Sequence, residues 1–141
     1  ALGTPLRDLV TLAGGEPQEG GKIVIGGPMM GRAAMTLDTF TTKGLSGVLF
    51  LGSDKARRRQ PEACIRCGKC VDACPMGLEP YLLATFSRLG RFEDAEREAV
   101  TDCLECGSCS FSCPASRPIL DYIRVGKQAV MAARRARQQK K

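Results

Sequence analysis

Cysteines occur twice in this chain at the spacing C-x2-C-x2-C-x3-C-P. The residues of the two runs are Cys64, Cys67, Cys70, Cys74 and Pro75, then Cys103, Cys106, Cys109, Cys113 and Pro114. Three thiolates at this spacing can wrap a short loop around one cube of iron and sulfide, and the fourth corner needs a more distant donor. The pattern is therefore the signature of two cubane iron-sulfur clusters.

The source of each fourth ligand follows from two-cluster ferredoxins, in which the cysteine before the proline binds the other cluster. We therefore expect crossed ligation. The first cluster is assigned Cys64, Cys67, Cys70 and Cys113. The second is assigned Cys103, Cys106, Cys109 and Cys74. This scheme uses all eight cysteines of the chain and joins the two runs into one unit.

Zinc and disulfides explain the cysteines less well. A zinc site usually combines two C-x2-C pairs that are a dozen or more residues apart. Disulfide frameworks suit small secreted domains, and no secretory signal is visible at the start of the chain. The chain has no histidine, which excludes a Rieske centre. Since metal binding is coupled to folding in small domains, we expect the cluster-free chain to be disordered beyond about residue 60.

The cysteine-free residues 1–52 read as a separate α/β module with many glycines and short β-like runs. Thr4 is expected to cap a helix that ends at Gly14. Strands are predicted at 22–25 and 48–51.

The polar, charged segment 53–61 is interpreted as a linker, and the cluster domain follows over 62–130. The spacer between the cysteine runs has a helical pattern, which Gly90 ends. The apolar stripe of this predicted helix consists of Leu78, Leu82, Phe86 and Leu89. A longer helix is predicted after Pro118, so helices are expected to carry the clusters.

The formal net charge of +6 comes entirely from the end of the chain. Residues 120–141 hold seven basic and one acidic side chain, whereas residues 1–119 hold fourteen of each. The basic tail, 131–141, could bind anionic lipid, an acidic protein or nucleic acid, or could be a solvated helix end. Nucleic acid is the least favoured of these because no aromatic residues are interleaved with the charges.

Taken together, these residues resemble the C subunit of the Rnf (Rsx) ion-translocating electron transport complex, from Gly3 to about Lys127. The matching segments are GTPLRDLV at Gly3, IGGPMMG at Ile25, Thr42-Lys43, CIRCGKCVDACPMGLEPYLL at Cys64, and DCLECGSCSFSCP at Asp102 followed by Pro118, Tyr122 and Arg124. The resemblance implies an α+β fold: a small β-grasp-like, soluble-ligand-binding module, then a mainly helical two-cluster ferredoxin-like domain. It also implies that this chain is a C-terminal piece.

The resemblance further implies a peripheral subunit at the cytoplasmic face of the bacterial inner membrane. Its two 4Fe-4S clusters would pass single electrons between a ferredoxin-like partner subunit and a flavin that exchanges hydride with NAD. FMN and NAD(H) are expected only in a missing upstream domain, so this piece of an ion-translocating ferredoxin:NAD oxidoreductase would only carry electrons and has no catalytic residue. Its partners would be other subunits and not nucleic acid, with membrane contact indirect or through the basic tail.

Two other functions fit the cysteine runs. One is the electron-transfer subunit of a soluble flavoprotein reductase, similar to a cobalamin reductase. The other is a cluster-based redox sensor whose basic tail holds nucleic acid. Arg66 and Lys69 are expected to raise the potential of the first cluster relative to that of the second, which has Glu105 beside it.

Overall fold

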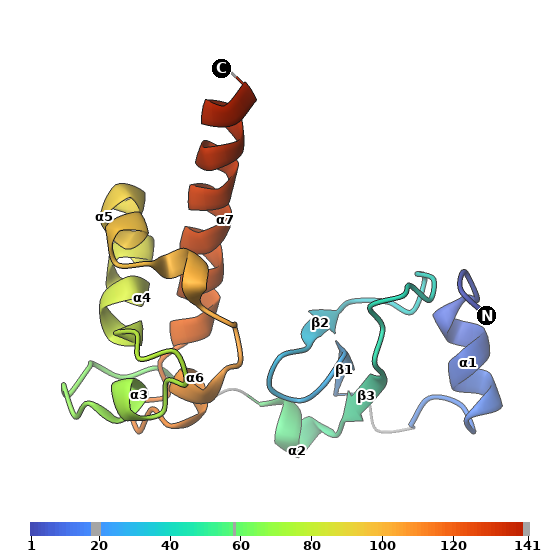
Figure 1. Cartoon of the computed structure of the whole chain (residues 1–141). Coiled ribbons are helices and arrows are strands. Elements are labelled where there is room, and N and C mark those ends of the chain that lie inside the picture. Colours follow the sequence, from blue (N-terminus) through green and yellow to red (C-terminus); the bar gives the residue numbers. More distant parts are fainter. Residues whose placement is uncertain (18–20, 58, 140–141) are drawn as a thin grey trace. The chain divides into compact units, whose positions relative to one another are not determined.

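The computed structural model describes residues 1–17, 21–57 and 59–139 (Figure 1). The chain divides into two compact units, Ala1–Arg59 and Gln60–Lys141. The division falls inside the predicted linker, 53–61, of which Arg58 lies outside the described residues. Part of this segment is helical, because α2 covers Ser53–Ala56 and contacts the strand before it.

The first unit contains a three-stranded antiparallel sheet in the order β2-β1-β3. The central strand β1, Lys22–Ile25, and the edge strand β3, Val48–Leu51, confirm the two predicted strands. The other edge strand, β2, covers Arg32–Ala34 and is not predicted from the sequence, because Arg-Ala-Ala has no β-branched or aromatic residue. The unit is therefore mixed helix and sheet, and the narrower β-grasp assignment stays a prediction.

Helix α1, Leu6–Leu12, supplies the helical part of the core of this unit. Leu6 and Val10 are buried together with Leu37, and side chains of β1 and β3 pack against them. The predicted cap is wrong: Pro5 occupies the N-cap position, and the Thr4 hydroxyl instead donates to the Ala1 carbonyl at 2.7 Å. Pro5 has an extended backbone, with φ −57° and ψ 138°, so the helix begins one residue later than predicted, at Leu6.

The second unit is helical. Its elements are α3 (Lys69–Asp72), α4 (Pro80–Arg88), α5 (Phe92–Arg97), the 3-10 helix η1 (Val100–Asp102), α6 (Ser108–Phe111) and α7 (Ile119–Gln139). Helices α4 and α5 pack along the long helix α7, which continues past them (Figure 1). The buried core of this unit consists of Leu83, Ala84, Ala95, Val100, Cys109, Ile119, Ile123 and Val130.

The buried face of α4 differs only in part from the predicted stripe, since Leu78 and Phe86 of that stripe pack against the core. Leu83, Ala84 and Ser87 are buried, whereas Leu89, a member of the predicted stripe, is 55% exposed. The cause is the close approach of α7, where a Cβ added to Gly126 would overlap Ser87 Oγ and lie 2.8 Å from Ser87 Cβ. The two helices meet through their smallest side chains, and the larger residues of α4 lie to either side.

Helix α7 passes through residue 130, the predicted end of the cluster domain. From residue 131 to 139 its side chains are exposed, and Arg134 and Arg137 pair with Glu96 of α5 at 2.6 and 3.3 Å. Lys140 and Lys141, the end of the predicted basic tail, lie outside the described residues. Within the described ranges, no helix combines the length and the apolar character needed to cross a bilayer.

Candidate metal centre

The two cysteine runs fold into the same backbone pattern. Arg66 and Glu105, each placed before the second cysteine of its run, have positive φ angles of 54° and 56°. The glycines after that cysteine, Gly68 and Gly107, have φ angles of 78° and 85°. A one-turn helix then begins at the next residue of each run, α3 or α6. The repeated spacing in the sequence is thus a repeated loop in space.

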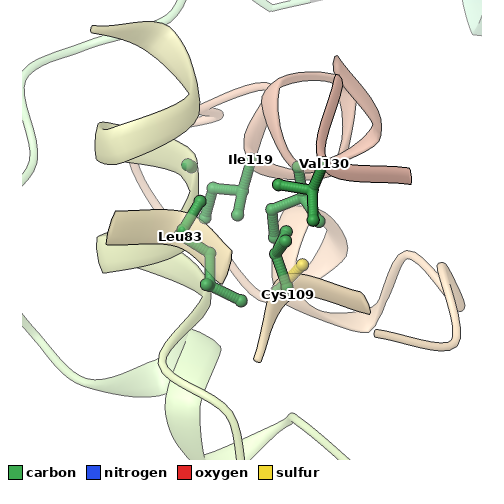
Figure 2. Close-up of a cluster of buried hydrophobic side chains, with 8 residues drawn as sticks. Leu83, Cys109, Ile119 and Val130 are labelled. Carbon is green, nitrogen blue, oxygen red and sulfur yellow. The ribbon is translucent and has the colours of Figure 1, made fainter. Parts of the chain in front are cut away.

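The third cysteine of each run lies on its short helix, and the two helices pack against each other. Cys109 is buried to 7% exposure among the apolar side chains of the core, close to Leu83, Ile119 and Val130 (Figure 2). Burial raises the pKa of the Cys109 thiol to about 11, and the thiolates of Cys103 and Cys106 contribute to the shift. These three cysteines of the second run therefore lie near one another.

A cavity in the second unit joins the two runs. Its sulfur lining consists of Cys74, Cys103, Cys106 and Cys109. The rest of its lining is largely apolar and includes Leu78, Leu83, Leu104, Leu120 and Ile123. Cys74 also contributes, through its thiolate, to the raised pKa of Cys103, although burial is the largest cause. Four thiols from two loops, enclosed by hydrocarbon, fit the chemistry of an iron-sulfur cluster.

The first run is more open to solvent. Cys64 and Cys67 are exposed, and Cys70 is half-buried. The pKa of Cys70 is raised first by burial, with further contributions from the thiolates of Cys113 and Cys64. The cysteine of the second run that lies near Cys70 is thus Cys113, which precedes Pro114. In the same way Cys74, which precedes Pro75, lies near Cys103.

No group of three or more Cys, Asp or Glu side chains in the described ranges is arranged to hold a single metal ion.

Two hydrogen bonds act on individual sulfurs of the second run. The Glu105 amide donates to Cys103 Sγ at 3.4 Å, and Cys106 Sγ lies 3.4 Å from Ser108 Oγ. The bond with Ser108 is the largest cause that lowers the pKa of the Cys106 thiol.

Helix α7 reaches back to the loop of the second run with two cations. Arg124 Nε lies 3.0 Å from Glu105 Oε2, and Lys127 Nζ lies 3.5 Å from Glu105 Oε1. The Lys127 ammonium also donates to the Cys103 carbonyl at 2.6 Å. The loop is therefore tied to the helix at the residue that carries its strained φ angle.

Sequence reasoning assigns no role to Lys127 or to Ser108. One signal is present for the lysine, because Arg124 and Lys127 are three residues apart and share a helix face. Their target is not predictable, since Glu105 and Cys103 lie 19 and 24 residues away from the two cations along the chain. The signal for Ser108 is its position beside Cys106, at the start of a short helix.

Comparison with known protein families gives the same assignment for the cysteine runs. Residues 56–114, which contain all eight cysteines, match the family described as a 4Fe-4S dicluster domain.

Nearly the whole chain is similar to the C subunits of ion-translocating complexes. It is 43% identical over 134 residues to the C subunit of the Na(+)-translocating ferredoxin:NAD(+) oxidoreductase complex of Acetobacterium woodii, covering 95% of this chain and 30% of that protein. It is 45% identical to the C subunit of the proton-translocating ferredoxin:NAD(+) oxidoreductase complex of Clostridium ljungdahlii, covering 94% of this chain and 29% of that protein. It is 44% identical to the C subunit of the ion-translocating oxidoreductase complex of Yersinia pestis, covering 93% of this chain and 21% of that protein. Over nearly its whole length the chain is therefore similar to C subunits of ion-translocating oxidoreductase complexes, and it spans less than a third of the length of these relatives.

Proposed function

We propose that this chain is the electron-transfer segment of the C subunit of an ion-translocating ferredoxin:NAD oxidoreductase, and that it binds two 4Fe-4S clusters. The observation that carries the proposal is the cavity lined by thiols from both cysteine runs, Cys74 together with Cys103, Cys106 and Cys109. The match to the 4Fe-4S dicluster domain over 56–114 supports the same cofactor.

The ligands are crossed between the runs. Cys103, Cys106, Cys109 and Cys74 hold one cluster, which the shared cavity supports. Cys64, Cys67, Cys70 and Cys113 hold the other. The Cys113 and Cys64 thiolates both contribute to the raised pKa of Cys70, after burial, and this supports the second set because such effects act between neighbouring groups.

Bound clusters supply one-electron chemistry, and the residues of the chain set the conditions for it. Leu78, Leu83 and Ile123 line the cavity and exclude water from the second centre. The exposure of Cys64 and Cys67 leaves the first centre close to solvent, where a redox partner can approach it. Packing of α3 against α6 keeps the two centres adjacent. No nucleophile or general base is needed in this segment, and hydride exchange with NAD belongs to a flavin site elsewhere in the full-length protein.

The segment works at the cytoplasmic face of the inner membrane and is held there by other subunits of the complex, one of them ferredoxin-like. The names of the relatives, each a subunit of a translocating complex, support the association with other subunits. The exposed basic end of α7, which includes Arg134, Arg135 and Arg137, offers an additional contact with an acidic partner or anionic lipid.

The first experiment is metal analysis of the chain purified without oxygen. About eight iron and eight acid-labile sulfide per polypeptide are expected, with spin coupling between two reduced cubanes in the low-temperature EPR spectrum of the dithionite-reduced protein. Zinc in place of iron, or iron for a single cluster, would refute the two-cluster proposal.

Crossed ligation is tested by comparing four single variants. Cys113→Ala is expected to leave the same remaining EPR signal as Cys67→Ala, because both remove a ligand of the first centre. Cys74→Ala is expected to match Cys106→Ala for the same reason. If Cys113→Ala instead matches Cys106→Ala, each run binds its own cluster and the crossed assignment is wrong.

A further inference from the structure

The two cysteine loops have the same backbone but opposite charges at their equivalent position. Arg66 of the first run and Glu105 of the second both have the left-handed φ angle and both precede the second cysteine. Arg66 is exposed, whereas the Glu105 side chain is only 26% exposed and faces α7. The electrostatic difference between the two loops therefore depends on which side chains of α7 contact Glu105.

Helix α7 places two partly buried cations there. The Arg124 and Lys127 side chains are 19% and 24% exposed, and both contact the Glu105 carboxylate. Lys127 Nζ has a second contact, 2.6 Å from the carbonyl oxygen of the cluster ligand Cys103. Glu105 does not make this loop negative, because the three side chains together carry one net positive charge.

Charges at such positions affect reduction more than exposed charges do. One-electron reduction adds a negative charge to the metal centre, so a nearby cation favours the reduced state and a nearby anion disfavours it. Partial burial limits screening by water and salt. Lys127 has two contacts, with the Glu105 carboxylate and the Cys103 carbonyl, and these hold its ammonium beside Cys103.

We propose that Lys127 and Glu105 are positioning residues that set, with opposite signs, the reduction potential of the centre bound by Cys103, Cys106, Cys109 and Cys74. The inference rests on the proposed function, because it requires a cluster at these cysteines. It replaces the expectation from the sequence that Glu105 lowers the potential of the second centre unopposed. Lys127 raises that potential, and Glu105 limits the increase while holding the lysine in place.

The test is an EPR-monitored redox titration, with dithionite as the electron donor, on the chain purified with its clusters. Lys127→Met is expected to lower the equilibrium constant for reduction of the second centre by roughly tenfold. Glu105→Gln is expected to raise the same constant by a similar factor. Lys127→Arg keeps the charge and should restore the wild-type value. The double variant Glu105→Gln/Lys127→Met should lie near wild type, since it removes one charge of each sign.

The opposite signs separate this proposal from a purely structural role. Both single variants break the same ion pair, so a structural role would move the potential in the same direction for each, and that result would overturn the proposal. Loss of the second centre in Lys127→Met and Glu105→Gln, with the first centre retained, would also overturn it, because the residues would then be needed for assembly.

Two controls assign the effect to one centre. Arg66→Gln, at the equivalent position of the first loop, is expected to lower the potential of the other centre only. Arg134→Gln, farther along α7 and paired with Glu96, should move neither. A wild-type chain without clusters would refute the proposed function, whereas a wild-type chain with two clusters whose potentials ignore Lys127 and Glu105 would refute this inference alone.

Discussion

Among the described residues, four that are not glycine have a left-handed backbone: Arg66, Ala99, Glu105 and Ser116. Three of them lie in or just after the cysteine loops, where the turn around the sulfurs requires a positive φ angle. Ala99 has a different place, immediately after α5, with a φ angle of 56°. This conformation costs an L-residue roughly 1–2 kcal/mol, a cost that glycine does not carry.

Ala99→Gly is therefore expected to stabilise the second unit by about 1 kcal/mol, because glycine is the residue best suited to the left-handed position after a helix. The measurement is the urea midpoint followed by circular dichroism at 222 nm on the cluster-containing chain. Ala132→Gly, on the exposed part of α7, is the matched control and should destabilise by about 0.5–1 kcal/mol. A loss of stability in Ala99→Gly would contradict the strain argument.

The contacts of Asp38 predict that the stability of the first unit depends on pH. A hydrogen bond from Thr36 and an ion pair with Arg7, 2.8 Å away, hold the pKa of Asp38 below its ordinary value of 3.8. The pKa of Asp38 is lower in the folded state than in the unfolded state. Its stabilising effect is therefore present at pH values above the unfolded-state pKa, and it is lost as the pH falls through the folded-state pKa. Asp38→Asn should therefore weaken the amide protection of α1 at pH 6.

Below the folded pKa of Asp38, wild type and Asp38→Asn are expected to give equal amide protection in α1, because the wild-type carboxyl is then neutral as well. Hydrogen exchange at pH 6 and at the lowest pH at which wild type stays folded, compared between proteins at the same pH, measures this. Asp54→Asn, which removes an exposed carboxylate of α2 and leaves α1 unchanged, is the control and should change the protection of α1 little at either pH. An equal deficit of Asp38→Asn at both values would show that the charge is not responsible.

At the scale of elements, the contact between α4 and α7 organises the second unit. Gly126 and Ser87 let the two helices approach closely, and Ser87 satisfies its buried hydroxyl by donating to the Leu83 carbonyl at 2.7 Å. The same helix α7 carries Arg124 and Lys127 to the second cysteine loop. A change in the spacing between α4 and α7 therefore reaches the candidate metal centre.

Gly126→Ala is expected to destabilise the second unit by about 1–3 kcal/mol, because the new methyl group overlaps Ser87 and forces the helices apart. Urea unfolding measures the cost. In Ser87→Gly/Gly126→Ala the space is restored, so the double variant should be more stable than the sum of the two single effects predicts. Gly44→Ala, where a Cβ meets nothing within 4 Å, should be close to neutral. Additive single effects would contradict a direct clash.

For the whole molecule, the two units differ in what holds them together. The core of the first unit consists of aliphatic and aromatic side chains, including Leu6, Val10 and Leu37. The core of the second includes or contacts cysteines from both runs, namely Cys70, Cys103, Cys109 and Cys113. The structural consequences of metal loss should therefore be confined to the second unit.

Removal of iron with a chelator after oxidation is expected to unfold the second unit and leave the first one folded, because all eight cysteines, the proposed cluster ligands, lie in the second unit. Amide hydrogen exchange, read separately for β1–β3 and for α4 and α7, gives the answer for each unit in one sample. Persistent protection of α4 and α7 would show that the hydrophobic core alone is sufficient. Loss of protection in β1–β3 would show that the two units are not independent.

The strands β1 and β3, the helical character of the second unit and the repeated cysteine loops could all be predicted from the sequence. Each of these depends on local information: ligand spacing within eleven residues, short β-branched runs, and glycines that end helices. The comparisons with known proteins agree with the family that the resemblance indicated. The individual ligand assignments stay predictions until the variants are measured.

The full buried face of α4 and the charges around Glu105 could not be predicted from the sequence, because both depend on tertiary contacts. The apolar residues of α4 allow more than one buried face, and the close packing at Gly126 selects Leu83, Ala84 and Ser87. The partners of Glu105 come from a helix that begins fourteen residues later, and no local pattern links them. Contacts between distant segments depend on how helices pack, so their charges and burial become defined only in the folded chain.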